Sequence, residues 1–196
     1  MDIDGFLRDP LSRRRFFRMA GVSTGAGGAA AFLAACGDGT TTPAVVTGPD
    51  ESDQADVEIL NGVLDLELMA IAAYKTAAGR MRGSVLEIGK LLLAQEQEHA
   101  DALVAAVEEA GGRPNRAKAS YDFPRMRSQQ DALRFALQLE NTAIAAYIDA
   151  LPKFSRGALR ATAACSASLV MIDAAVLLDA LGMEPAPEAF VTGRTS

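Results

Sequence analysis

A nine-residue segment that occurs twice constrains the fold of this chain more than any other feature. Residues 66–74 (LELMAIAAY) recur as residues 139–147 (LENTAIAAY), with seven of nine positions identical at an offset of 73 residues. Alanines match easily by chance in an alanine-rich chain, but a glutamate and a tyrosine in the same frame do not. A repeat of this length indicates two related units, each long enough for a pair of helices.

Four long stretches carry the period of an α-helix, and glycines stand near their ends. Ala and Leu dominate the composition while aromatic residues make up 6%, which favours helix over sheet. The sequence therefore predicts an all-α fold, an antiparallel four-helix bundle. The expected helices are residues 53–79, 84–111, 128–151 and 156–182.

The link between the second and third expected helices is unusually long. It runs from Gly112 to Arg127 and contains Pro114 and Pro124. Because antiparallel neighbours need only a short connection, a link of this length predicts a crossover from one end of the bundle to the other. We expect the bundle to span residues 53–183, followed by a C-terminal tail, 184–196.

Each copy of the repeat places a glutamate on the apolar face of its helix. Glu67 and Tyr74, like Glu140 and Tyr147, are seven residues apart and so lie about 20° from eclipsed. Both pairs share their stripe with Leu, Val, Ile and Ala side chains, which predicts that the acids point into the core. The second helix adds Glu96 and His99, three residues apart and so on one face; His99 is the only histidine.

One carboxylate from each of two helices, with Glu-x-x-His from the others, is the metal-site pattern of ferritin-like bundles. Over about residues 55–182 the chain resembles the ferritin-like superfamily, in particular those of its members that are secreted with a twin-arginine signal. It implies a metal site of iron or manganese, with tyrosines beside it. The matching positions are Glu67, Glu96, His99 and Glu140 for the metal, and Tyr74 and Tyr147 for the nearby tyrosines.

The fourth helix departs from that pattern. Adding the repeat offset of 73 to Glu96 and His99 gives Leu169 and Ile172, and a slippage of one residue gives Val170 and Asp173. Either way the glutamate and the histidine are missing, so the two-iron motif is degenerate. Asp173 is the fifth candidate ligand. We expect one ion, held by Glu67, Glu96 and His99, with Glu140 and Asp173 as the far wall, a weak second position or hydrogen-bond acceptors.

Two functions follow from such a cluster. Buried carboxylates without a lysine or arginine partner require either a bound cation or protons, and carboxylates with one imidazole suit iron, manganese or, less well, zinc. The first function is a metal-binding protein with weak iron oxidation or peroxide chemistry. The alternative is a non-catalytic envelope scaffold or stress-protection protein with a vestigial site. The sequence does not decide whether the protein is an enzyme.

The N-terminal segment resembles an export signal. Residues 12–18 (SRRRFFR) resemble a twin-arginine motif with Arg13 and Arg14 as its pair, and residues 33–36 (LAAC) resemble a lipobox that ends in Cys36. We expect a signal peptide, 1–35, and a flexible tether, 36–52. The protein would be extracytoplasmic, in the periplasm or cell envelope, and anchored to the lipid membrane through a lipidated Cys36.

Charge limits the partners. The net charge is −6; without residues 1–35, which contain five Arg and three Asp, 14 basic and 22 acidic residues leave −8. An acidic chain argues against nucleic acid as a partner. Protein partners stay unknown, and a homodimer is an open alternative.

Overall fold

The computed structural model describes residues 51–194. The expected signal peptide and residues 36–50 of the expected tether, with Arg13, Arg14 and Cys36, lie outside the described residues, whereas residues 51 and 52 of that tether belong to the first helix. The described part is helical, without strands, which confirms the predicted fold class. Its elements are α4 (Glu51–Ala77), the short 3-10 helix η1 (Ala78–Arg80), α5 (Gly83–Glu109), α6 (Gln129–Ala150), a second 3-10 helix η2 (Leu151–Lys153) and α7 (Gly157–Ala180).

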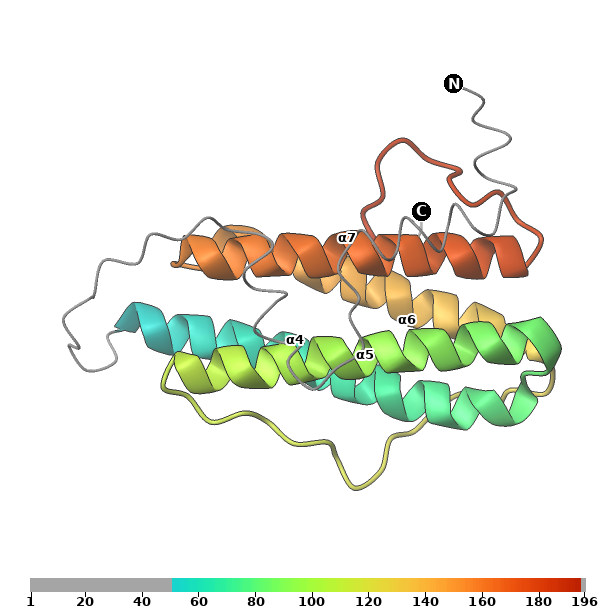
Figure 1. Cartoon of the computed structure of the whole chain (residues 1–196), viewed down its shortest axis with the longest axis horizontal. Coiled ribbons are helices and arrows are strands. Elements are labelled where there is room, and N and C mark those ends of the chain that lie inside the picture. The colour runs from blue at the N-terminus through green and yellow to red at the C-terminus, as the bar shows by residue number, and fades with distance from the viewer. Residues whose placement is uncertain (1–50, 195–196) are drawn as a thin grey trace. The chain divides into compact units, whose positions relative to one another are not determined.

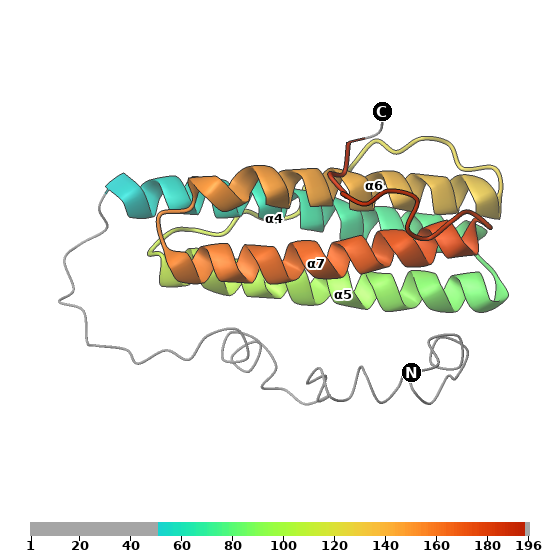
Figure 2. The same ribbon diagram turned by 90° about the horizontal axis from the view of Figure 1, so that it is seen from above.

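The four long helices form two hairpins that pack against each other (Figures 1 and 2). α4 and α5 make the first hairpin, and α6 and α7 the second; α4 lies beside α6, and α5 beside α7. Residues 110–128 carry the chain from the end of α5 along the outside of the bundle to its opposite end, where α6 begins (Figure 1). The expected crossover is therefore present, and it makes the two hairpins repeat each other in space.

Local sequence explains where the helices begin and end. α6 starts with a capping box, in which the Ser128 side chain accepts from the Asp131 amide and the Asp131 carboxylate accepts from the Ser128 amide. After α5 and α7 the chain turns through Gly111 (φ +75°) and Gly182 (φ +72°). The amide of Gly112 then donates to the Val107 carbonyl, and that of Met183 to the Leu178 carbonyl, which closes both helices with Schellman motifs.

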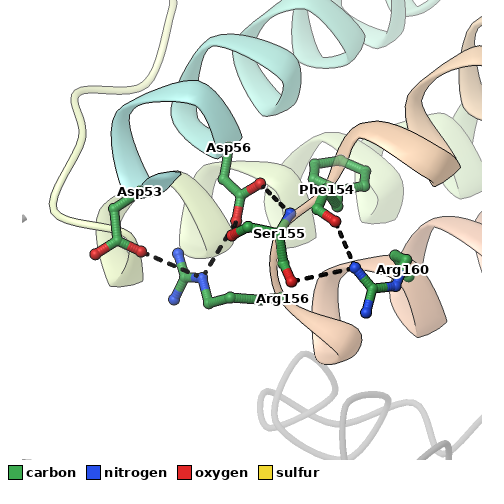
Figure 3. A network of polar contacts seen from close by, with 6 residues as sticks. All are labelled: Asp53, Asp56, Phe154, Ser155, Arg156 and Arg160. Carbon is green, nitrogen blue, oxygen red and sulfur yellow. Dashed lines mark hydrogen bonds and ion pairs between the residues drawn. The ribbon is translucent and has the colours of Figure 1, made fainter. Parts of the chain in front are cut away.

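A polar network ties the start of α4 to the turn between α6 and α7 (Figure 3). The fully buried Asp56 accepts hydrogen bonds from the amide and the hydroxyl of Ser155, at 2.8 and 2.6 Å. Arg156 Nε lies 3.5 Å from Asp56 Oδ2 and 3.6 Å from Asp53 Oδ1. Although burial raises the pKa of Asp56, the Ser155 hydrogen bonds and Arg156 outweigh it and hold that pKa below its usual value. The network thus joins one end of each hairpin.

α7 is the most apolar helix of the described part. By length and composition it alone among residues 51–194 passes as a membrane span, with a mean hydropathy of 1.9 over its most apolar window. A core helix of a bundle has the same composition. In this structure α7 packs on α6 and α5, and its inward face carries the polar Ser166 and Asp173 as well as apolar residues.

Candidate metal centre

The metal ligands and neighbouring tyrosines predicted from the sequence all lie inside the bundle. Each of the four helices contributes at least one buried polar side chain, although the surrounding core is apolar. They are Glu67 and Tyr74 from α4, Glu96 and His99 from α5, Glu140 and Tyr147 from α6, and Asp173 from α7.

Three of these residues form a compact group. Glu67, Glu96 and His99 each offer one ligand atom such that all three atoms lie within 4.8 Å of one another. The Nδ1 atom of His99 lies 3.6 Å from Glu96 Oε2 and 3.9 Å from Glu67 Oε1. These separations exceed a hydrogen bond. They are close to the spacing of about 3.4 Å between two donors bound tetrahedrally to one ion at about 2.1 Å.

The two tyrosines bond across the bundle in a reciprocal way. The hydroxyl of Tyr147 on α6 donates to Glu67 Oε1 on α4 at 2.5 Å, and the hydroxyl of Tyr74 on α4 donates to Glu140 Oε1 on α6. Burial, the neighbouring glutamates and these hydrogen bonds raise the pKa of both phenols well above 10, so both stay neutral donors. Each glutamate of the repeat is therefore oriented by the tyrosine of the other copy.

Several polar atoms of the cluster have no hydrogen-bond partner. They are the second carboxylate oxygens of Glu67 and Glu140, Oε2 of Glu96, Oδ2 of Asp173 and Nδ1 of His99. Within residues 51–194, the ion pairs of this cluster join its carboxylates to His99 and not to a lysine or arginine. Leaving a buried polar atom without a partner costs about 1–3 kcal/mol. A cation bound among these five atoms would provide the partner that they lack. Two carboxylates and an imidazole are a donor set for iron, manganese or zinc.

Without a cation, protons are the other way to reduce the charge. Burial, together with the hydrogen bond and charge of Glu67, raises the pKa of Glu96 to about 10. Burial and the charge of Glu96 raise the pKa of Glu140 well above its usual value, against the hydrogen bond from Tyr74. Burial raises the pKa of Asp173 to about 7, although His99 acts in the opposite direction. At neutral pH the metal-free cluster therefore retains a proton on Glu96, and the raised pKa of Glu140 favours the protonated form of that carboxyl.

The structure decides between the two alternatives for α7. Val170 is fully buried and Asp173 is 3% exposed, whereas Ile172 is 44% exposed and Leu169 is half-buried. The one-residue slippage is therefore correct, and Val170 and Asp173 occupy the positions on α7 that Glu96 and His99 occupy on α5. Glu140 and Asp173 lie in the same buried layer but outside the compact group.

Two buried polar residues of the bundle were missed by sequence reasoning. Ser166 is buried on α7, and its hydrogen bond to Tyr147 acts to lower the pKa of that phenol. It lies seven residues before Asp173, so the stripe of α7 contained the signal. Asp56 lies 11 residues before Glu67, three helical turns away on the same stripe, and that spacing was the signal for its burial.

Fold and site together define a four-helix bundle with a carboxylate–histidine cluster in its core. This is the class of ferritin-like bundles that the sequence resembles. The chain belongs to the ferritin-like domain family, whose model matches residues 55–182. It is similar to the crystal structure of a conserved hypothetical protein from Mycobacterium tuberculosis, with a TM-score of 0.64 and 23% identity over 71% of this chain and 99% of that one.

A second solved structure is a ferritin-like, diiron-carboxylate protein from Bacillus anthracis. Its TM-score is 0.50, at 19% identity over 68% of this chain and 94% of that one. At these identities both likenesses concern the fold alone. No match was found among curated proteins.

Proposed function

We propose that this protein is an exported, membrane-anchored ferritin-like protein that binds one iron or manganese ion through Glu67, Glu96 and His99. The observation that carries the proposal is the compact group of these three buried side chains, with an unpartnered atom on each. The two carboxylates would neutralise a divalent cation. The cation would in turn bind the three atoms that have no hydrogen-bond partner.

The chain's own residues prepare the site for such an ion. Tyr147 donates to one oxygen of Glu67 and leaves the other oxygen free. His99 and Glu96 lie one helical turn apart on α5, so a single rigid helix sets their separation. Burial of all three excludes bulk water. A bound iron or manganese ion supplies one-electron redox chemistry, which makes weak oxidation of iron or reaction with peroxide the activity to test.

Elemental analysis of the protein, purified after native export, tests the proposal. We expect close to one equivalent of iron or manganese in the wild type, and its loss in Glu67→Gln and in His99→Ala. Glu98→Gln is the matched control, because Glu98 lies on the exposed side of α5. Less than about a tenth of an equivalent in the wild type would leave the site essentially empty and remove the proposal.

Membrane anchoring is a separate part of the proposal, supported by the motifs around Arg13, Arg14 and Cys36. We expect Cys36→Ser to abolish labelling by a radioactive fatty acid and to move the protein out of the detergent phase on partitioning. We expect Arg13→Lys with Arg14→Lys to retain the precursor in the cytoplasm. An unlabelled wild-type protein would contradict the anchor, whatever its metal content.

A second candidate is a non-catalytic envelope scaffold with a vestigial site. It is supported by the reciprocal tyrosine–glutamate hydrogen bonds and by the raised pKa of Glu96, which allow the cluster to persist without metal. On this function, His99→Ala changes stability but not metal content. A variant that loses bound iron while its fold stays intact counts against it.

A further inference from the structure

The two hairpins of the bundle are related copies, and the structure gives the register of both halves of the repeat. From α4 to α6 the offset is 73 residues, because α4 ends at Ala77 and α6 at Ala150. From α5 to α7 the offset is 74, because α5 begins at Gly83 and α7 at Gly157. The turn of the second hairpin is thus one residue longer than that of the first. This extra residue accounts for the slippage that the sequence left open.

With this register, each candidate ligand of the first hairpin can be paired with a position in the second. Glu67 corresponds to Glu140, and their tyrosines exchange hydrogen bonds across the bundle. Glu96 corresponds to Val170, which is fully buried, and His99 corresponds to Asp173. The repeat therefore preserves its glutamate and tyrosine in α4 and α6, but it does not preserve the glutamate and histidine of α5 in α7.

This asymmetry divides the buried cluster into two unequal halves. The first half has the three donors of the compact group, with a nitrogen among them. The second half retains Glu140, with one oxygen bonded to Tyr74 as Glu67 is bonded to Tyr147, and Asp173. Val170 offers no donor, and the carboxylate of Asp173 stands on a shorter side chain than the imidazole it replaces.

We infer that Val170 and Asp173 limit this bundle to a single metal ion, and that restoring the α5 pattern on α7 creates a second metal position. The inference rests on the proposed function, since it assumes that the first position binds metal. It goes beyond that function by naming the residues that determine how many ions the protein holds.

Val170→Glu combined with Asp173→His tests the inference. The full-length protein is titrated with Mn²⁺ alone, and bound ions are counted by the loss of the free Mn²⁺ signal in electron paramagnetic resonance. We expect one ion in the wild type and two in the double variant, with a spin-coupled pair in the spectrum of the latter. Leu169→Glu combined with Ile172→His is the matched control. It adds the same side chains in the outward register and is expected to keep one buried ion without the coupled signal.

The outcomes separate the two proposals. One ion in both the wild type and a folded double variant overturns the inference and leaves the proposed function standing. Two ions in the wild type also overturn the inference. No ion in the wild type removes the proposed function, and the inference with it.

Asp173→Asn keeps the test decisive if the buried glutamate at position 170 prevents folding. Asp173 lies outside the compact group, so we expect this variant to bind one Mn²⁺ ion with an affinity within about threefold of the wild type, a difference of about 0.7 kcal/mol. Loss of the ion would mean that α7 contributes a ligand to the first position, which overturns the division of the cluster.

Discussion

At the scale of single residues, the phenol of Tyr147 has a role that its counterpart lacks. Both tyrosines donate to a buried glutamate on the facing helix. Only Glu67, the acceptor of Tyr147, belongs to the compact group. The same chemical bond therefore orients a proposed ligand in one case and a neighbouring carboxylate in the other.

Tyr147→Phe is expected to weaken metal binding, because the hydrogen bond that orients Glu67 is lost while the ring keeps its packing. A loss of about 1.4 kcal/mol, at the upper end of the range for a typical hydrogen bond, corresponds to about tenfold in affinity. Tyr74→Phe is the matched control, with a similar cost in stability and a change in affinity of less than about threefold. Titration against a competing chelator measures the affinity, and urea unfolding measures the stability. An equal loss of affinity in both variants would contradict this division of roles.

Glu96→Gln separates ligation from stability. With its pKa raised to about 10, mainly by burial, Glu96 is protonated in the metal-free protein at pH 7, and glutamine has the same shape and charge as that form. Because Glu96 ionises in the unfolded chain at pH 7 but not in the folded one, we expect the substitution to remove that cost and to raise the free energy of unfolding without metal by up to about 3 kcal/mol. Metal content should fall to background. A large destabilisation without metal would show that Glu96 is ionised there.

At the scale of elements, the Asp56 network determines how the first hairpin meets the second at one end of the bundle (Figure 3). Asp56 and Asp53 both lie near Arg156, but Asp56 is fully buried and also accepts two hydrogen bonds from Ser155. Arg156 therefore forms one ion pair with a buried aspartate, Asp56, and one with a partly exposed aspartate, Asp53.

Asp56→Ala is expected to destabilise the bundle by about 3 kcal/mol, since it removes a buried carboxylate and leaves its donors unpaired. Asp53→Ala is expected to cost less than about 1 kcal/mol, as partly exposed pairs do. Chemical denaturation of the two variants measures the difference. Similar costs for both would mean that the buried hydrogen bonds to Ser155 add nothing.

Most of the elements and of the buried stripe could be predicted from the sequence, for identifiable reasons. Helical period and proline content located the four helices and the crossover to within a few residues. The repeated Glu67 and Glu140 indicated the inward faces, because acids within an apolar stripe are visible in one helix alone. The register of α7 was not predictable, since it depends on one extra residue in a turn. The burial of Asp56 was visible in the stripe of α4, but its partner was not predictable, because Ser155 lies 99 residues away.

At the scale of the whole molecule, the described residues combine two kinds of buried acid with opposite effects of pH. Asp56 has a lowered pKa, held down by Ser155 and Arg156 against burial. Glu96, Glu140 and Asp173 have raised pKa values, because burial and neighbouring acids disfavour their charged forms. His99 on α5 lowers the pKa of Asp173, and Glu67 on α4 raises it. The charge of Asp173 in turn raises the pKa values of Glu96 and Glu140.

The metal-free protein is therefore expected to be most stable near pH 4 to 5. Below that range the folded Asp56 carboxylate must be protonated, so its contribution is lost as pH falls. Above about pH 4 the acids with raised pKa ionise in the unfolded chain but not in the folded one. Stability then decreases by up to about 1.4 kcal/mol per pH unit for each group, until Asp173 ionises near pH 7 and Glu96 near pH 10.

Thermal unfolding between pH 4 and 9, with and without metal, measures this dependence. We expect the Tm of the metal-free protein to fall over the range, and Asp173→Asn to flatten the part below pH 7. Bound Mn²⁺ should reverse the slope, because it competes with the protons on Glu96 and favours the ionised cluster. A metal-free Tm that rises steadily from pH 4 to 8 would show that the buried acids are already ionised in the folded protein. In that case the bundle would tolerate the charge of its core without either a cation or protons.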